Sequence, residues 1–123
     1  MHISVIEDNA GVRTMVETAL KLHGHVVETY ANSPSFFLAL QAAERTPPYD
    51  LVIVDLFLEQ QLGTDIVEAL STKQPQVIPT ILISAAEENV VAPIRKCYPD
   101  LPILRKPFKI QALVSLINKA TAS

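Results

Sequence analysis

The sequence is poor in cysteine, glycine and tryptophan. Its 123 residues include one cysteine, three glycines and no tryptophan. Cys97 has no second cysteine to pair with, so an internal disulfide is excluded and a reducing, cytoplasmic setting is indicated. No phosphate-cradling, glycine-rich loop follows the first apolar run, which argues against a nucleotide or flavin binder.

Charged residues and long apolar runs are also scarce. Charged residues make up 19% of the chain, the net charge is −3 and the pI is near 5.5. Because the chain has no excess of basic residues, we expect no direct binding of nucleic acid. No stretch approaches the roughly 18 apolar residues that cross a membrane, and the start MHISVIEDN lacks the features of a signal peptide. We therefore expect no membrane association.

The chain does contain a regular alternation of strand and helix patterns. Hydrophobic residues make up 49% of it, which fits a sheet covered on both faces. Strand-like runs begin near residues 2, 26, 51, 79 and 102, and each gap has room for one helix. This alternation predicts an α/β fold, with residues 1–123 forming one domain around a doubly wound, five-stranded parallel sheet. The five expected helices are Ala10–Leu22, Ser33 to just before Thr46, Thr64–Lys73, Glu87–Tyr98 and Lys109–Ala120.

Helix boundaries and buried faces follow from capping residues and the helical period. Ser33 followed by Pro34 predicts an N-cap and a first helical residue, and Pro75 is expected to end the third helix. Pro93 lies inside the fourth helix, where we expect it to kink or shorten the helix. The residues expected to face the core are Val12, Met15, Val16, Ala19, Phe36, Phe37, Leu40, Ile66, Val67, Leu70, Ile110, Leu113, Val114 and Ile117.

Four of the apolar runs end on residues that can take part in phosphate or metal chemistry: Glu7, Asp8, Asp55, Ser84 and Lys106. The carboxyl ends of parallel strands meet at one edge of a sheet, so we expect these side chains to share a pocket. Clustered carboxylates resist ionisation unless a cation joins them, and Mg²⁺ prefers such oxygen ligands. Lys106 and Ser84 can hold phosphoryl oxygens. We interpret Asp55 as a nucleophile that attacks phosphorus and forms an acyl phosphate.

Four segments carry a resemblance to a known family. They are VIEDN ending at Asn9, DLVIVD ending at Asp55 with Gly63 eight residues later, ILIS ending at Ser84, and LRKPF ending at Phe108. In this order and spacing, the chain resembles over essentially its whole length the receiver domain of bacterial two-component response regulators. The resemblance implies a flavodoxin-like fold with strand order 2-1-3-4-5.

The resemblance also implies a metal site and its ligands. Asp8 and Asp55 would bind Mg²⁺ directly, together with the backbone carbonyl of Phe57. Glu7 would act mainly through a bound water. The domain would catalyse only its own phosphorylation and dephosphorylation, so it would not be an enzyme with an external substrate.

The remaining implied roles concern the phosphoryl group and the partners. Asp55 would accept it from a phosphohistidine of a sensor histidine kinase or phosphotransfer protein. Ser84 and Lys106 would hold its oxygens, and the Lys106–Pro107 peptide would be cis. The kinase would meet the first helix and the loops around Asp55, whereas an output partner or a second copy would meet the fourth and fifth helices.

Five positions depart from the usual pattern of the family. Glu59 stands where many relatives have Pro, which is expected to alter the shape of the loop after the acceptor aspartate. Glu7 replaces the commoner Asp, and its longer arm is expected to reach metal-bound water. Ile103 stands where the family usually has a Tyr or Phe that swings inward, so that part of the usual switch is absent. Phe57 and Ala86 flank the site and are apolar, so neither can position a hydrolytic water.

Two other functions stay open at this point. A phosphatase of the haloacid-dehalogenase type also uses an aspartate at a strand end, but it needs a second Asp two residues later, where this chain has Phe57. A receiver-like module that signals by protein contact without phosphate is favoured by Ile103. A test of Asp55 phosphorylation distinguishes this phosphate-independent module from a receiver domain that accepts a phosphoryl group.

Overall fold

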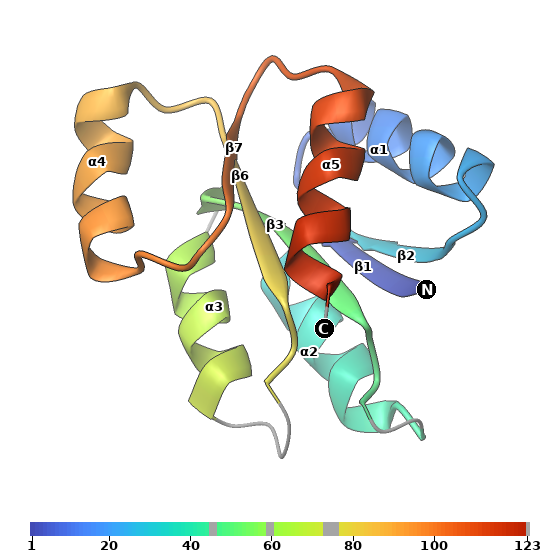
Figure 1. Cartoon of the computed structure of the whole chain (residues 1–123). Coiled ribbons are helices and arrows are strands. Elements are labelled where there is room, and N and C mark those ends of the chain that lie inside the picture. The colour runs from blue at the N-terminus through green and yellow to red at the C-terminus, as the bar shows by residue number, and fades with distance from the viewer. Residues whose placement is uncertain (45–46, 59–60, 73–76, 123) are drawn as a thin grey trace.

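A five-stranded parallel sheet forms the centre of the molecule (Figure 1). The computed structural model describes residues 1–44, 47–58, 61–72 and 77–122. The order of the strands in the sheet is β2-β1-β3-β6-β7, which confirms the predicted order of the five main strands. The strands are β1 (His2–Ile6), β2 (Val26–Tyr30), β3 (Leu51–Asp55), β6 (Thr80–Ser84) and β7 (Ile103–Arg105).

The central strands are apolar because the sheet is covered on both faces. Every residue of β3 and of β6 is buried. Ile53 in β3 pairs with Val5 in β1 on one side and with Ile81 in β6 on the other. The ends of β3 and β6 are therefore held in a tightly packed part of the molecule.

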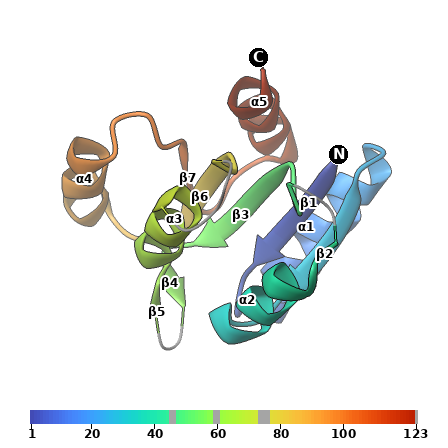
Figure 2. The ribbon, with the colours of Figure 1, turned by 90° about the horizontal axis from the view of Figure 1, so that it is seen from below.

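Five helices cover the two faces of the sheet (Figures 1 and 2). Helices α1 (Ala10–Leu22) and α5 (Ile110–Thr121) pack on one face, and α2 (Ser33–Ala42) and α3 (Gly63–Thr72) pack on the other. Helix α4 (Glu88–Cys97) contributes Ile94 to the edge of the second layer. The fully buried side chains that these helices bring to the sheet include Val16, Leu20, Phe36, Ile66 and Leu113.

Two details of the helix predictions were wrong. Asn32, not Ser33, caps α2, because the Asn32 side chain accepts a hydrogen bond from the backbone N–H of Ser35. Met15 is 43% exposed, whereas Val16 and Leu20 are completely buried. Val16 and Leu20 are four residues apart and lie on one face of α1, and Met15 is rotated about 100° from Val16.

The helix boundaries otherwise agree with the prediction to within one residue, with one exception: α2 ends at Ala42, whereas it was expected to run to just before Thr46. The expected stop at Pro75, and the residues Thr46 and Lys73, lie outside the described residues. Pro93 does not end α4, which continues to Cys97. It removes only the hydrogen bond that its N–H would give to the carbonyl of Asn89, in the exposed first turn of the helix.

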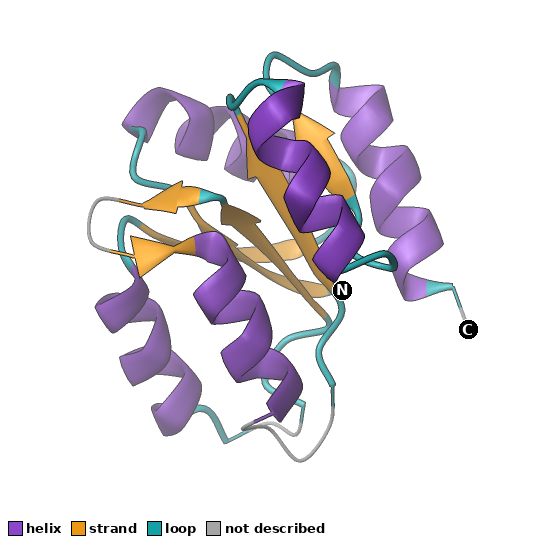
Figure 3. Ribbon diagram, turned by 90° about the vertical axis from the view of Figure 1, so that its left-hand side faces the viewer, coloured by secondary structure: helices purple, strands orange, loops and turns teal. Residues whose placement is uncertain are grey.

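A short hairpin leaves the sheet directly after β3 (Figures 2 and 3). Strands β4 (Phe57–Leu58) and β5 (Gln61–Leu62) pair in the antiparallel direction, with Phe57 opposite Leu62. Two-residue strands leave too little alternation to detect, so the sequence did not predict them. None of the described helices is long and apolar enough to cross a lipid bilayer.

Candidate functional site

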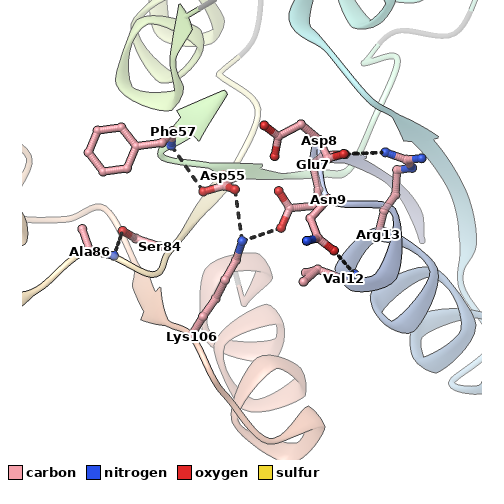
Figure 4. A network of polar contacts seen from close by, with 10 residues as sticks. All are labelled: Glu7, Asp8, Asn9, Val12, Arg13, Asp55, Phe57, Ser84, Ala86 and Lys106. Carbon is pink, nitrogen blue, oxygen red and sulfur yellow. Dashed lines mark hydrogen bonds and ion pairs between the residues drawn. The ribbon is translucent and has the colours of Figure 1, made fainter. Parts of the chain in front are cut away.

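The ends of four strands bring the expected polar side chains together at one edge of the sheet (Figure 4). Glu7 and Asp8 follow β1, and Asp55 and Ser84 are the last residues of β3 and β6. Lys106 follows β7, and its side chain points toward the carboxylates. The parallel sheet thus joins residues that are up to 99 positions apart in the chain.

Lys106 bridges two carboxylates. Its Nζ donates hydrogen bonds to Oε1 of Glu7, at 2.5 Å, and to Oδ2 of Asp55, at 3.0 Å. Burial by itself would lower the pKa of Lys106, but the bonds to Glu7 and Asp55 outweigh that effect and raise the pKa. Lys106 therefore carries its positive charge at neutral pH.

Glu7 is completely buried. Burial, together with the neighbouring Asp55 carboxyl, raises its pKa to about 7, and Lys106 opposes this shift. Its second oxygen, Oε2, is buried and has no hydrogen-bond partner among the described residues. A buried carboxylate oxygen without a partner is costly, so this atom marks a place where a ligand would be stabilising.

The acidic side chains fit a divalent cation. Glu7, Asp8 and Asp55 each offer an oxygen, and these oxygens lie within 4.8 Å of one another. Asp8 is exposed, which leaves a solvent side for metal-bound waters. Three carboxylates face one ammonium group, so negative charge is in excess. The orphaned Oε2 of Glu7 and this charge balance both favour a hard cation such as Mg²⁺.

Two side chains hold the loop after β1: the cap residue Asn9 and Arg13 in α1. The Asn9 side chain caps the helix by accepting a hydrogen bond from the N–H of Val12. The Arg13 guanidinium donates to the backbone carbonyls of Glu7, at 2.8 Å, and Asp8, at 3.4 Å. These bonds set the direction in which the two acidic side chains leave the chain.

The position of Asp55 depends on the start of the hairpin and of α3. Oδ1 of Asp55 accepts a hydrogen bond of 3.3 Å from the N–H of Phe57. The N–H of Gly63 donates to the carbonyl of Leu56 at 2.6 Å. A Cβ on Gly63 would overlap the carbonyl oxygen of Asp55. Glycine is therefore required here because two stretches of backbone approach closely.

Ser84 is completely buried and lies at the same edge of the sheet as Asp55. Its hydroxyl accepts a hydrogen bond of 2.9 Å from the N–H of Ala86. Its carbonyl accepts one of 2.7 Å from the N–H of Lys106, which ties the end of β6 to the residue after β7. The Lys106–Pro107 peptide is cis, as predicted.

Glu59 lies outside the described residues, and the other departures noted in the sequence have clear positions. Phe57 is 50% exposed, and Ala86 is half-buried. Ile103 is half-buried and packs against the core between the sheet and the α2–α3 layer.

Two site residues were missed by the sequence reasoning. Arg13 lies four residues after the cap Asn9, and this spacing could have indicated a side chain folded back over the loop. Arg105, which donates to the carbonyl of Ala86 at 3.2 Å, had no sequence signal besides its place next to Lys106.

The strand order and the two helical layers define a flavodoxin-like, doubly wound fold. Residues 3–118 match the family described as response regulator receiver domain. The chain belongs to this family, the receiver domains of two-component response regulators. The expected family and fold are thereby confirmed.

Known proteins with similar sequences match nearly the whole chain. Regulatory protein VirG of Agrobacterium fabrum is 34% identical over 122 residues, which are 97% of this chain and 45% of VirG. The DNA-binding transcriptional regulator NtrC of Azospirillum brasilense is 26% identical, over 98% of this chain and 24% of NtrC. The chain thus spans less than half the length of these curated relatives.

Two solved structures show the fold. Chemotaxis protein CheY4 of Vibrio cholerae superposes with a TM-score of 0.82 at 22% identity and covers 97% of both chains. A response regulator receiver domain protein of Clostridium thermocellum gives a TM-score of 0.83 at 24% identity, over 98% of this chain and 93% of the other.

Proposed function

We propose that this domain accepts a phosphoryl group on Asp55 from a phosphohistidine of a sensor histidine kinase or phosphotransfer protein, and that the acyl phosphate changes its contacts with partners. The observation that carries the proposal is the Lys106 ammonium 3.0 Å from Oδ2 of Asp55, in a pocket with Glu7 and Asp8. This arrangement surrounds one carboxylate with the charges that phosphoryl transfer needs.

The proposed step is a displacement at phosphorus. A carboxylate oxygen of Asp55 forms a bond to phosphorus while the bond between phosphorus and the imidazole nitrogen of the donor breaks. The electron pair of that bond stays on the imidazole, which takes up a proton. The Lys106 ammonium neutralises charge on a phosphoryl oxygen, and the Ser84 hydroxyl donates a hydrogen bond to another.

The acidic residues would hold the metal that such a transfer uses. Glu7, Asp8 and Asp55, with the backbone carbonyl of Phe57, are the groups that would bind Mg²⁺. When bound, the ion would neutralise negative charge on the carboxylates and on the incoming phosphoryl group. The partnerless Oε2 of Glu7 supports a role toward the ion, directly or through water.

The proposal is tested by phosphorylation of Asp55 with a small donor. The domain is incubated with Mg²⁺ and acetyl phosphate, or with beryllofluoride as a mimic, and the mass gain or mimic binding is measured. Asp55→Asn is expected to abolish both. Asp50→Asn is a matched control, because Asp50 lies just before the same strand at its other end and accepts a bond from the N–H of His2, which an amide oxygen can still accept.

A second variant tests the assignment of Lys106. Lys106→Ala is expected to leave Mg²⁺ binding intact and to weaken the response to phosphoryl donor or mimic. An unchanged response would remove Lys106 from the proposed mechanism.

A phosphate-independent interaction module is the other candidate, because Ile103 replaces the usual aromatic ring. In that case the wild type would be inert to donor and mimic. The partner faces on α1, α4 and α5, the cytoplasmic setting and the lack of direct nucleic acid binding remain predictions.

A further inference from the structure

Arg105 lies beside the site without touching Asp55. It is the last residue of β7, and its pairing partner in the sheet is Ser84 at the end of β6. Its Nε donates to the carbonyl of Ala86 at 3.2 Å. Ala86 is thus held at both backbone groups, because its N–H also donates to the Ser84 hydroxyl.

The contact with Ala86 orients the Ser84 hydroxyl. A serine hydroxyl has one donor hydrogen and two acceptor lone pairs. The Ala86 N–H occupies a lone pair, so the hydroxyl hydrogen is directed elsewhere. Ser84 and Asp55 are the last residues of β6 and β3, at the same edge of the sheet (Figure 4). A phosphoryl oxygen on Asp55 would find a donor that is already oriented, so less conformational freedom would be lost on binding.

The Arg105 guanidinium is itself held in place. Its Nη1 lies 3.7 Å from Oε2 of Glu88 in the first turn of α4, and Oε1 of Glu88 lies 3.4 Å from Nε of Arg95. The planar guanidinium can reach a carbonyl and a carboxylate at the same time, which a lysine ammonium does less well. The contacts are partly exposed, so each one is of modest strength.

We propose that Arg105 is a positioning residue, which fixes Ala86 and thereby presents the Ser84 hydroxyl to a phosphoryl group on Asp55. The inference rests on the proposed function and deepens it. It gives a role to a charged residue of β7 on the strand where Ile103 replaces the usual aromatic side chain.

The test is a titration of the wild-type domain and its variants with beryllofluoride at saturating Mg²⁺, followed by the amide signal of Ala86. Arg105→Met is expected to raise the half-saturating concentration about fivefold, as expected for loss of one partly exposed charged contact. Mg²⁺ affinity without beryllofluoride should not change. Arg105→Lys keeps a donor and should recover part of the loss. Lys109→Met removes an exposed charge four residues along the chain from Arg105 and should behave as the wild type.

The other outcomes of this titration show whether the role of Arg105 or the proposed function itself is wrong. If Arg105→Met binds the mimic as well as or better than the wild type, Arg105 does not position Ser84. An equal loss in Lys109→Met would assign the effect to charge alone and also overturn the inference. If the wild type binds no beryllofluoride, the proposed function fails and this inference fails with it.

Discussion

Glu7→Gln should make the metal-free domain more stable at neutral and higher pH. The pKa of Glu7 rises from 4.5, its ordinary value, to about 7 in the folded protein, with burial as the main cause. The folded state therefore binds a proton more tightly than the unfolded chain does. The contribution of Glu7 to stability is highest below pH 4.5 and falls as the pH rises toward 7, because the folded protein must then ionise a buried group.

The size of the effect follows from the shift. Each pKa unit corresponds to about 1.4 kcal/mol, so the shift of Glu7 corresponds to about 3 kcal/mol at pH 8. A glutamine resembles the protonated carboxyl and never pays this cost. We therefore expect Glu7→Gln and the wild type to be about equally stable near pH 4.5, and the variant to be more stable by up to about 3 kcal/mol at pH 8.

The assay is urea unfolding of both proteins in the presence of a chelator, at several pH values between 4 and 8. All other titrating groups are shared, so the difference in free energy of unfolding isolates Glu7. Asp8→Asn, on an exposed side chain in the same cluster, is the matched control and should not give a stabilisation of this size. A difference between Glu7→Gln and the wild type that stays constant over this range would refute the reasoning.

Three further variants probe the frame around the site. Ser4→Ala should be neutral or stabilising by about 1 kcal/mol, because the buried Ser4 hydroxyl has no partner among the described residues; a clear loss of stability in urea would contradict this. Tyr49→Phe should cost about 1–3 kcal/mol, since the buried Tyr49 hydroxyl donates to Glu28 at 2.9 Å, and thermal unfolding tests it. Gly63→Ala should cost about 2–3 kcal/mol, because the new Cβ would overlap the carbonyl of Asp55; an unchanged urea midpoint would show that the backbone can move.

The sheet and the site residues could be predicted because both depend on short patterns of neighbouring residues in the sequence. Short apolar runs separated by one helix length define a parallel sheet, and the geometry of such a sheet brings the strand ends together. The residues after the runs, from Glu7 to Lys106, could therefore be placed in one pocket without knowledge of any contact.

The features that the sequence did not predict depend on three-dimensional contacts, which no short sequence pattern specifies. Arg105 is one of two exposed arginines among the described residues, and only the pairing of β7 with β6 brings it to the carbonyl of Ala86. The cap of α2 was misplaced by one residue, because Asn32 and Ser33 are both good caps and the side-chain direction decides between them.

Ile103 and Arg105 lie on the same short strand, but Ile103 is half-buried and Arg105 is exposed, which indicates different roles. Ile103 is already packed against the core, and an aliphatic side chain has no polar group that could follow a change at Ser84. Arg105 contacts the loop after β6 and the first turn of α4. Any movement of Ser84 toward a phosphoryl group must act on Ala86, because the two residues share a hydrogen bond. A signal from Asp55 to α4 would therefore run through the backbone of this loop and the Arg105 guanidinium. It would not use a Tyr or Phe ring at the position of Ile103, as the usual pattern of the family implies.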